Sequence, residues 1–418
     1  MKLFLLLLAL ADLTSAQLRI DPQIAAEISK IKAIDNHAHP VLPAAGDSGY
    51  DALPVENMEP FTEPARTRAG TPLAAEASHQ LFGNAHPRDL IEQKREGYPN
   101  WVLDQLDIET MLANRISLGP GLTPPRFLWV PYEDALMYPL NNASLASKNS
   151  DRKAFFADED RLLHQYLKEC GFSTAPATLD EYLPKVVDTT LARHKHAGAV
   201  AVKFEAAYLR SLDFDDVSRA EAGAVYHRGR AGAIADADYK KLQDYIFRHI
   251  AAEAGRLGMA VHLHVEWGPG GYFHIAGTNP LLLESVVNDP SLHRTNFVLL
   301  HGGWPFTREI TPILSKPNVY ADFSGQTLTN YPRAVAQVLR EWLEFAPEKV
   351  LFATDAYPYS EEMGWEQSGW IANQTGRQAL GLALTEMLND REITPKRALE
   401  LAHMVLRDNA AKLYGLKQ

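Results

Sequence analysis

The 418-residue sequence has little cysteine, no concentrated basic region and only one long apolar run. Cys170 is the single cysteine, so the chain cannot form an intramolecular disulfide or a cysteine-rich metal site. The formal net charge is -11, from 41 basic and 52 acidic residues, and no Lys/Arg cluster suggests a nucleic-acid surface. We therefore expect a protein that binds no nucleic acid.

The long apolar run lies at the N-terminus. Lys2 precedes a leucine-rich stretch at residues 3–11, and small residues follow at 14–16. A basic start, an apolar core and a small-residue cleavage site are typical of a secretory signal peptide. The run is too short for a permanent transmembrane helix. We expect residues 1–16 to be removed after Ala16, the protein to be exported to the periplasm or secreted, and no membrane association after cleavage.

Residues 17–418 are predicted to form one domain in which strand and helix patterns alternate. Short apolar runs predict eight strands, at residues 31–36, 109–116, 126–130, 198–204, 259–265, 297–300, 319–323 and 350–354. Helical patterns occur at residues 21–30, 89–106, 158–170, 179–194 and 236–257, with two C-terminal helices between about 375 and 414. This alternation indicates an α/β fold, a (β/α)8 TIM-type barrel. A doubly wound sheet is the alternative, but no G-x-G-x-x-G motif opens a helix.

Residues 41–87 interrupt this alternation directly after the first strand. They are rich in Pro, Gly, Ala, Glu and Thr and show weak periodicity. A loop of this length in a compact domain is usually functional. We expect an insertion over the barrel mouth, with further rim loops at residues 211–233 and from residue 272 onward.

Potential metal ligands stand at the ends of several predicted strands. They are His37, His39, His264, His301 and Asp355. The carboxyl ends of barrel strands converge on one rim, although they are far apart in sequence. His37 and His39 are two residues apart, so both side chains point to the same face of a strand. Imidazole and carboxylate groups together suit zinc and other divalent metals.

Two of these residues have plain structural alternatives. Asp355 follows a strand, where an aspartate could instead cap a helix. His262 shares a strand face with His264, and we expect it to lie deeper in the barrel as a hydrogen-bonded core residue or as a support for a ligand.

At these positions the chain resembles the amidohydrolase superfamily. Residues 199–305 are similar to the amidohydrolase-2 group, including the amidohydrolase-type domain fused to glutamine synthetase in some fungi. The resemblance rests on Lys203-Phe204-Glu205-Ala206-Ala207-Tyr208-Leu209-Arg210, Asn279-Pro280-Leu281-Leu282, Leu300-His301-Gly302-Gly303 and Asn409-Ala410-Ala411-Lys412-Leu413-Tyr414. It covers nearly all of the chain after residue 17 and is patchy between residues 41 and 130.

The resemblance implies a (β/α)8 barrel that uses a metal ion. It implies that His37, His39 and Asp355 bind the metal, with His264 as a further ligand. His301 would either bind a second metal or orient the attacking water. Asp355 would also carry the proton, so Asp355 and His301 are the expected catalytic residues. We expect one or two divalent ions, with zinc as the metal.

The chemical state of Lys203, at the end of the fourth strand, distinguishes a site with one ion from a site with two. In binuclear members of the superfamily a lysine at this place is carboxylated and bridges two metals. The alternatives are that Lys203 pairs with a substrate carboxylate or points outward. Tyr208 and Arg210 are candidate anchors for an anionic substrate. Glu266 either contacts the substrate or is a solvated carboxylate, and it stands where the family often has Thr-Gly.

The sequence as a whole predicts a metal-dependent hydrolase that cleaves an amide C–N bond or an ester-like bond of a small molecule. A non-oxidative decarboxylase of the same group is one alternative. A barrel that binds a ligand without catalysis is the other, and a sugar-acid isomerase on the same scaffold is less favoured than either. The oligomeric state stays open, and a homo-oligomer is one outcome.

Overall fold

The computed structural model describes residues 19–42, 47, 49, 64–360 and 362–416. The expected signal peptide, residues 1–16, lies outside the described residues, as does much of the predicted insertion. Eight strands occur where the apolar runs predicted them. They are β1 (Ala33–Ala38), β2 (Ile108–Asn114), β3 (Phe127–Val130), β4 (Ala201–Phe204), β5 (Ala260–His264), β6 (Phe297–Leu300), β7 (Val319–Asp322) and β8 (Val350–Leu351).

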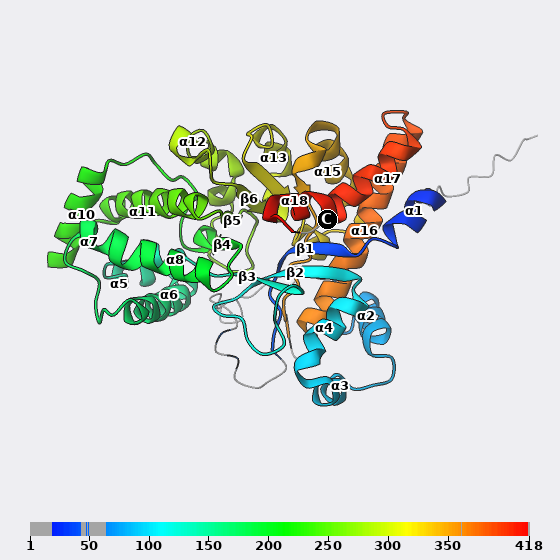
Figure 1. Cartoon of the computed structure of the whole chain (residues 1–418), viewed down its shortest axis with the longest axis horizontal. Coiled ribbons are helices and arrows are strands. Elements are labelled where there is room, and N and C mark those ends of the chain that lie inside the picture. Colours follow the sequence, from blue (N-terminus) through cyan, green and yellow to red (C-terminus); the bar gives the residue numbers. More distant parts are fainter. Residues whose placement is uncertain (1–18, 43–46, 48, 50–63, 361, 417–418) are drawn as a thin grey trace, which may run out of the picture.

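Helices follow or separate these strands and surround them (Figure 1). Those before β5 are α1 (Pro22–Ile28), α2 (Pro72–Phe82), α3 (Pro87–Lys94), α4 (Tyr98–Gln105), α5 (Ala143–Ala146), α6 (Ser150–Glu169), α7 (Leu179–Tyr182), α8 (Asp188–His196), α9 (Ala206–Leu209), α10 (Arg219–Ala231) and α11 (Asp236–Arg256). Those after β5 are α12 (Glu284–Val287), α13 (Thr307–Ile313), α14 (Gln326–Thr329), α15 (Pro332–Phe345), α16 (Trp365–Asn389), α17 (Pro395–His403) and α18 (Asn409–Tyr414).

All strand pairs are parallel, in two runs with the orders β1-β2-β3 and β4-β5-β6-β7-β8. Single bridges join the runs on one side, where Trp129 pairs with Ala199 and Tyr132 pairs with Lys203. On the other side, backbone N–H groups of Asn36 and Asp355 donate to the carbonyls of Phe352 and His37, at 3.0 and 2.8 Å. The strands therefore follow one another around a ring, as the predicted barrel requires.

Inside the ring a small apolar core fills the barrel. It takes buried side chains from both runs of strands and from α18, including Ile34, Leu112, Val130, Ala201, Val298, Leu351 and Ala410. The short strands are buried on both faces, which explains why a strand such as β6 is apolar throughout. Because the two runs share one interior, their carboxyl ends open toward the same side.

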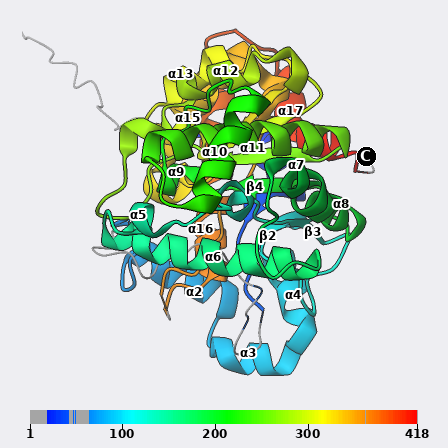
Figure 2. The same ribbon diagram turned by 90° about the vertical axis from the view of Figure 1, so that its left-hand side faces the viewer.

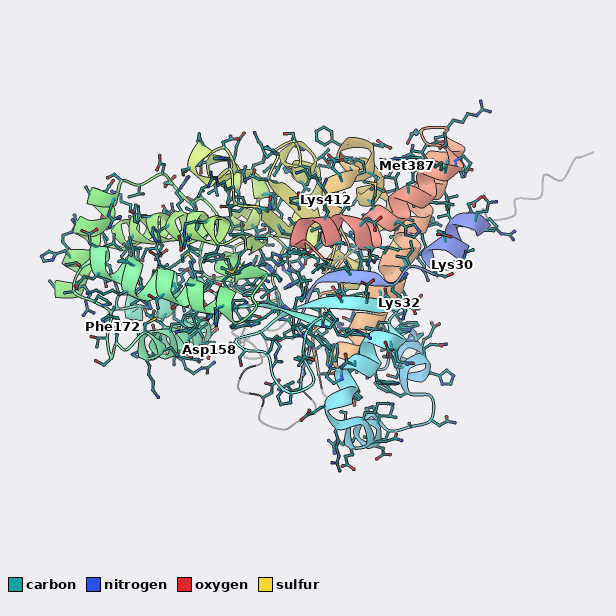
Figure 3. All side chains as sticks on the ribbon, viewed as in Figure 1. Lys30, Lys32, Asp158, Phe172, Met387 and Lys412 are labelled. Atoms are coloured by element: carbon teal, nitrogen blue, oxygen red, sulfur yellow. The ribbon has the colours of Figure 1, made fainter. Side chains whose placement is uncertain are left out.

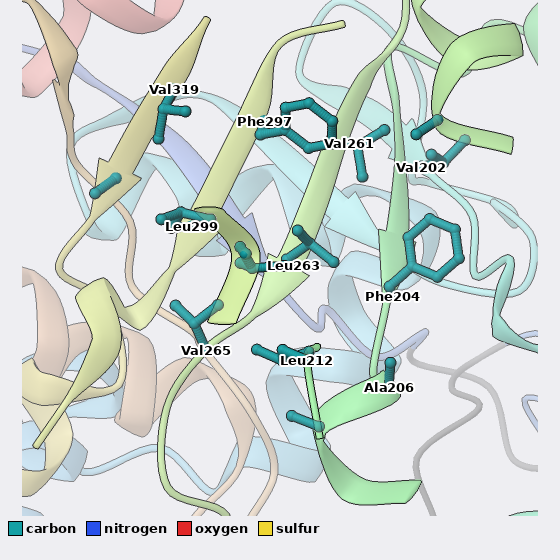
Figure 4. Close-up of a cluster of buried hydrophobic side chains, with 14 of the residues drawn as sticks. Val202, Phe204, Ala206, Leu212, Val261, Leu263, Val265, Phe297, Leu299 and Val319 are labelled. Carbon is teal, nitrogen blue, oxygen red and sulfur yellow. The ribbon is translucent and has the colours of Figure 1, made fainter. Parts of the chain in front are cut away.

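The outward faces of β4 to β7 form a second, larger core beneath the helices (Figure 4). Phe204 on β4 contacts Phe247 on α11, with ring centroids 5.1 Å apart. α15 has the expected amphipathic spacing, since Val335, Leu339 and Trp342 are buried on one face. Fully burying one such side chain contributes about 1.5–3 kcal/mol before conformational entropy is subtracted. This packing holds the strands whose ends carry the polar residues.

Charged side chains occupy the outer surface of the helical layer. Lys30 and Lys32, between α1 and β1, and Lys412 on α18 are exposed, whereas Met387 of α16 is buried (Figure 3). A view from the side shows α6, α10 and α11 in front, with α2, α3 and α4 below (Figure 2). Among the described helices, none combines the length and the apolar character needed to cross a bilayer.

Three sequence predictions need correction. The single helix predicted at residues 89–106 is interrupted at Arg95, whose φ of 50° is incompatible with a continuous helix, so α3 and α4 are separate. The rim loop predicted at 211–233 contains α10, which begins where Ser218 accepts a hydrogen bond from the N–H of Glu221. The predicted insertion at 41–87 contains α2, capped by Thr71.

Candidate metal centre

A cavity opens at the carboxyl ends of the strands. It encloses about 620 Å³, including its open mouth. All six metal ligands predicted from the sequence line it: His37, His39, Lys203, His264, His301 and Asp355. The tertiary structure thus brings together side chains that are up to 318 positions apart, between His37 and Asp355 (355 minus 37).

His37, His39 and Asp355 form the tightest group in the cavity. The Nε2 atoms of His37 and His39 lie 3.3 Å apart. Asp355 Oδ1 lies 3.2 Å from His37 Nε2 and 3.5 Å from His39 Nε2. The hydroxyl of Tyr132 is 3.2 Å from His39 Nδ1, the ring nitrogen on the other side. Tyr132 can therefore fix the ring orientation and tautomer of His39.

His301 stands opposite this group on the segment that follows β6. Its φ is 64°, an uncommon conformation for a residue with a side chain. The His301 N–H donates to Asp322 Oδ1 at 2.8 Å, and its Nδ1 is 2.9 Å from Ser324 Oγ. One ligand atom each from His37, His301 and Asp355 lie within 4.8 Å of one another, so these three residues could hold one ion.

His264 and His262 lie at different depths on β5, as predicted. His264 contacts the cavity, with Nε2 2.9 Å from the Glu266 carbonyl and Nδ1 3.6 Å from Glu205 Oε2. His262 is fully buried, and its Nε2 is 2.7 Å from the hydroxyl of Tyr414 on α18. Burial lowers the pKa of both histidines to about 3. His262 therefore belongs to the barrel interior rather than to the cavity.

Lys203 lies at the floor of the cavity and is fully buried. Its Nζ is 2.5 Å from Glu205 Oε1 and 3.4 Å from His37 Nε2. The sequence prediction did not single out Glu205, although it follows Lys203 by two positions and so shares its direction along the strand. Lys203 and Glu205 therefore form a buried pair next to the histidines.

The electrostatics of the cavity suit a cation. Burial lowers the pKa of His37 and His301 well below the ordinary value, so both rings are neutral and offer lone pairs. Burial alone would raise the pKa of Asp355, but His301 and His39 outweigh it and the pKa is lowered. Neutral imidazoles facing an ionised carboxylate are the donor set that a divalent metal requires.

The structure places the three predicted substrate residues differently. Tyr208 lines the cavity, and its ring centroid is 4.8 Å from that of His264. Glu266 also lines the cavity and is 5% exposed, so it is not a solvated carboxylate. Burial raises its pKa well above the ordinary value, and the charges of Asp355 and Asp322 add to this.

Arg210 is not among the residues that line the cavity. Its guanidinium pairs with Asp244 at 2.5 Å, donates to Gln243 and stacks on the ring of Phe214. The prediction that Arg210 anchors the substrate is therefore not supported by its position, because α11 supplies its partners.

Three further functional candidates escaped the sequence prediction. Glu205, Asp322 and Tyr132 each contact a predicted ligand, although none was predicted as a functional residue. Tyr357 and Tyr359, which follow β8, line the cavity. Two of the three had a usable signal: Glu205 lies in the segment that resembles the family, and Asp322 ends the seventh predicted strand as the ligands end theirs.

Comparison with known proteins identifies the family of the chain. A sequence profile of the amidohydrolase family, of the amidohydrolase-2 type, matches residues 34–416. The chain belongs to the amidohydrolase family. Protein FluG of Emericella nidulans is 29% identical over 187 residues, which is 43% of this chain. That match spans only 20% of the fungal protein.

Solved structures share the fold of this amidohydrolase. A protein from Lactobacillus casei named as a metal-dependent hydrolase has a TM-score of 0.62 and 18% identity, and the match covers 95% of this chain and 98% of that one. Uronate isomerase from Thermotoga maritima has a TM-score of 0.59 and 14% identity, over 94% of this chain and 98% of that one. Glucuronate isomerase from Caulobacter crescentus has a TM-score of 0.60 and 14% identity, over 95% and 94%.

These findings make the protein an enzyme of the amidohydrolase type with an α/β barrel fold. The family is metal-dependent, and His37, His301 and Asp355 form a candidate metal site.

Proposed function

We propose that this amidohydrolase cleaves an amide C–N bond or an ester-like bond of a small molecule with a metal-activated water. The observation that carries the proposal is the convergence of His37, His301 and Asp355 within one buried cavity. The donor atoms are neutral imidazole nitrogens and a carboxylate, which fit a divalent cation. The cavity encloses about 620 Å³ including its open mouth, a size that suits a small-molecule substrate.

His37, His39 and Asp355 would hold the ion, with His264 as a further ligand. We expect zinc, because imidazole and carboxylate ligands suit it. When bound, a divalent cation supplies Lewis acidity and makes hydroxide available near neutral pH. His301 faces Asp355, with Nδ1 3.8 Å from Oδ2, so it could orient the water or bind a second ion.

Asp355 is the proposed proton carrier. Its carboxylate faces the histidine cluster, and its lowered pKa keeps it ionised and ready to accept a proton from water. The water oxygen forms a bond to the carbonyl carbon, and the C–N or C–O bond of the substrate breaks. The proton taken by Asp355 then passes to the leaving nitrogen or oxygen. The remaining atoms of the water stay on the acid product.

Two ions would require Lys203 to be carboxylated. With Lys203 uncarboxylated and its Nζ 2.5 Å from Glu205 Oε1, we expect one ion. Anomalous-scattering maps of crystals of the metal-loaded protein count the ions. Electron density beyond Nζ would instead support the carboxylated form.

The test of the proposal starts with protein purified without chelator. Metal analysis should find about one transition-metal ion per chain, and a screen of small amides and esters should find turnover. Removal of the metal should abolish turnover, and zinc should restore it. Protein without bound metal, or release of carbon dioxide without addition of water, would contradict hydrolysis; the latter result would identify a decarboxylase.

We also propose that the protein is exported and that the mature chain begins at Gln17. The leucine-rich stretch and the small residues before Gln17 support this. N-terminal sequencing of the protein from the periplasmic fraction or the medium should start at that residue. Full-length protein in the cytoplasmic fraction would contradict export.

A further inference from the structure

Glu266 contributes a buried carboxylate to the cavity that the proposed hydrolysis does not use. The side chain is only 5% exposed, and among the described residues its Oε1 has no hydrogen-bond partner. Its Oε2 is 3.8 Å from His301 Nδ1, beyond hydrogen-bond distance. Leaving a buried carboxylate oxygen without a donor is costly, so the position predicts that a ligand supplies the missing donor.

The backbone opposite Glu266 is shaped to admit this carboxylate. Gly325 has a φ of 63°, which residues with a side chain rarely adopt. A Cβ at Gly325 would overlap Glu266 Oε2 and come within 3.1 Å of His301 Nδ1. The glycine therefore leaves space for the carboxylate beside the candidate metal site.

Aromatic side chains surround the same space. Tyr208, Trp267, Tyr357 and Tyr359 all line the cavity together with Glu266. The face of an aromatic ring attracts a cation, and the attraction grows when the cation is shielded from water. A carboxylate among aromatic rings suits a positively charged group better than a neutral or negatively charged one.

The charged residues of the cavity wall also favour a cationic ligand. Three carboxylates line it, from Glu205, Glu266 and Asp355, and among the described lining residues the only lysine or arginine is Lys203. Lys203 pairs with Glu205, and Asp355 faces the histidine cluster. Glu266 is thus the acid that has no cation beside it among the described lining residues. A cation placed beside it would offset the cost of burying that charge.

We propose that Glu266 is a specificity-determining residue that binds a protonated primary amine of the substrate. This inference rests on the proposed function and names its substrate class: small amides or esters that carry an ammonium group close to the scissile carbonyl. Because Glu266 Oε2 is near His301, the ammonium and the reacting carbonyl would be a few bonds apart.

The test compares substrates that differ in one substituent. The first probes are the 4-nitroanilides of alanine, lactic acid and propionic acid. On the same carbon these carry an ammonium, a hydroxyl and a hydrogen, respectively. The 4-nitroanilides of β-alanine and 4-aminobutyric acid vary the distance between the ammonium and the scissile carbonyl. For at least one ammonium probe, kcat/KM of the wild-type enzyme should exceed that of the counterpart without the amine by about tenfold or more. The reason is that a hydrogen bond between charged groups is stronger than one between neutral groups.

Glu266→Gln keeps the size of the side chain and removes its charge. It should bring the preference to within about twofold, mainly through a higher KM for the ammonium probe. Glu266→Asp should retain part of the preference. Glu284→Gln, which removes an exposed carboxylate on α12, is the matched control and should leave the preference unchanged. Thermal unfolding shows whether each variant is folded.

A binding measurement separates this inference from the proposed function. Calorimetry with the Asp355→Asn variant compares alaninamide with propionamide, and then repeats the comparison after Glu266→Gln is added. Preferential binding of alaninamide that disappears with Glu266→Gln supports the inference even if no anilide is cleaved. Equal binding of the two amides, or an equal loss of activity toward ammonium and neutral probes in Glu266→Gln, would overturn it while leaving the hydrolase proposal standing.

Discussion

The backbone N–H of His301 donates a 2.8 Å hydrogen bond to Oδ1 of Asp322, and this bond stabilises His301 in its left-handed conformation. The same carboxylate accepts from the N–H and hydroxyl of Ser324, and its other oxygen accepts from Asn36 at 2.9 Å. Asp322 thus connects the ends of three strands and determines where the imidazole of His301 lies.

Replacing Asp322 by alanine should impair both stability and turnover. The change leaves buried donors on His301, Ser324 and Asn36 without an acceptor, and each unsatisfied group costs about 1–3 kcal/mol. His301 should then lose its fixed position, and kcat should fall more than KM rises. Urea unfolding and steady-state kinetics measure the two effects. An unchanged kcat in folded Asp322→Ala would show that His301 keeps its position without this carboxylate.

Asp355→Asn should abolish most turnover while the protein stays folded. The amide cannot accept the proton, so we expect kcat to fall by about 100-fold or more. The substitution is nearly the same size, and the backbone bond from the Asp355 N–H to the His37 carbonyl is unaffected. Kinetics, metal content and thermal unfolding are compared with wild type. Turnover within a few fold of wild type would place the proton transfer elsewhere.

Lys203 and Glu205 should depend on each other for stability. Lys203→Met leaves the Glu205 carboxylate buried without its cation, which costs about 3–5 kcal/mol. The double variant Lys203→Met/Glu205→Gln removes both charges and should recover much of that loss. Urea unfolding of the wild type, both single variants and the double variant gives the coupling free energy. Additive effects would argue that the 2.5 Å contact is not an ion pair.

Arg210→Ala should change stability but not substrate recognition. The guanidinium pairs with Asp244, which keeps Lys240 as a second partner at 2.8 Å, so we expect a loss of about 1–3 kcal/mol. Its absence from the cavity wall predicts that KM stays within about twofold of wild type. A tenfold rise in KM would restore the role that the sequence suggested for this arginine.

The buried carboxylate of Glu159 on α6 should make the protein less stable as pH rises. Burial raises the pKa of Glu159 well above its ordinary value, and Asp134 raises it further. A group whose pKa is raised in the folded state contributes stability that is fully present below its unfolded pKa and is lost as pH rises through the folded pKa. Glu159→Gln removes that loss.

The variant should therefore gain stability over the wild type, and the gain should be larger at about pH 8 than at about pH 5. Thermal unfolding at both pH values measures it. Glu76→Gln, an exposed substitution on α2, should show no such difference. A gain that is equal at both pH values would mean that Glu159 is not the source of the pH dependence.

Much of the fold could be predicted from local patterns. Short runs rich in apolar residues, such as those of β4, β5 and β6, mark strands buried on both faces, and all eight strands lie where such runs occur. Helix boundaries were less predictable, because Arg95 and Ser218 act through backbone conformation and capping rather than through hydrophobic spacing.

The sequence by itself determined which residue types stand at the strand ends, and through them the family and a candidate metal-ligand set that includes His37, His301 and Asp355. The ligand set follows from the order of the strands along the chain, because the barrel brings successive strand ends to one rim. The tertiary structure decided which side chains contact these residues. Glu205 pairs with Lys203, and Asp322 accepts a hydrogen bond from the N–H of His301. Arg210 pairs with Asp244 and does not line the cavity. Such contacts depend on how elements distant in sequence pack in space, which no local pattern encodes.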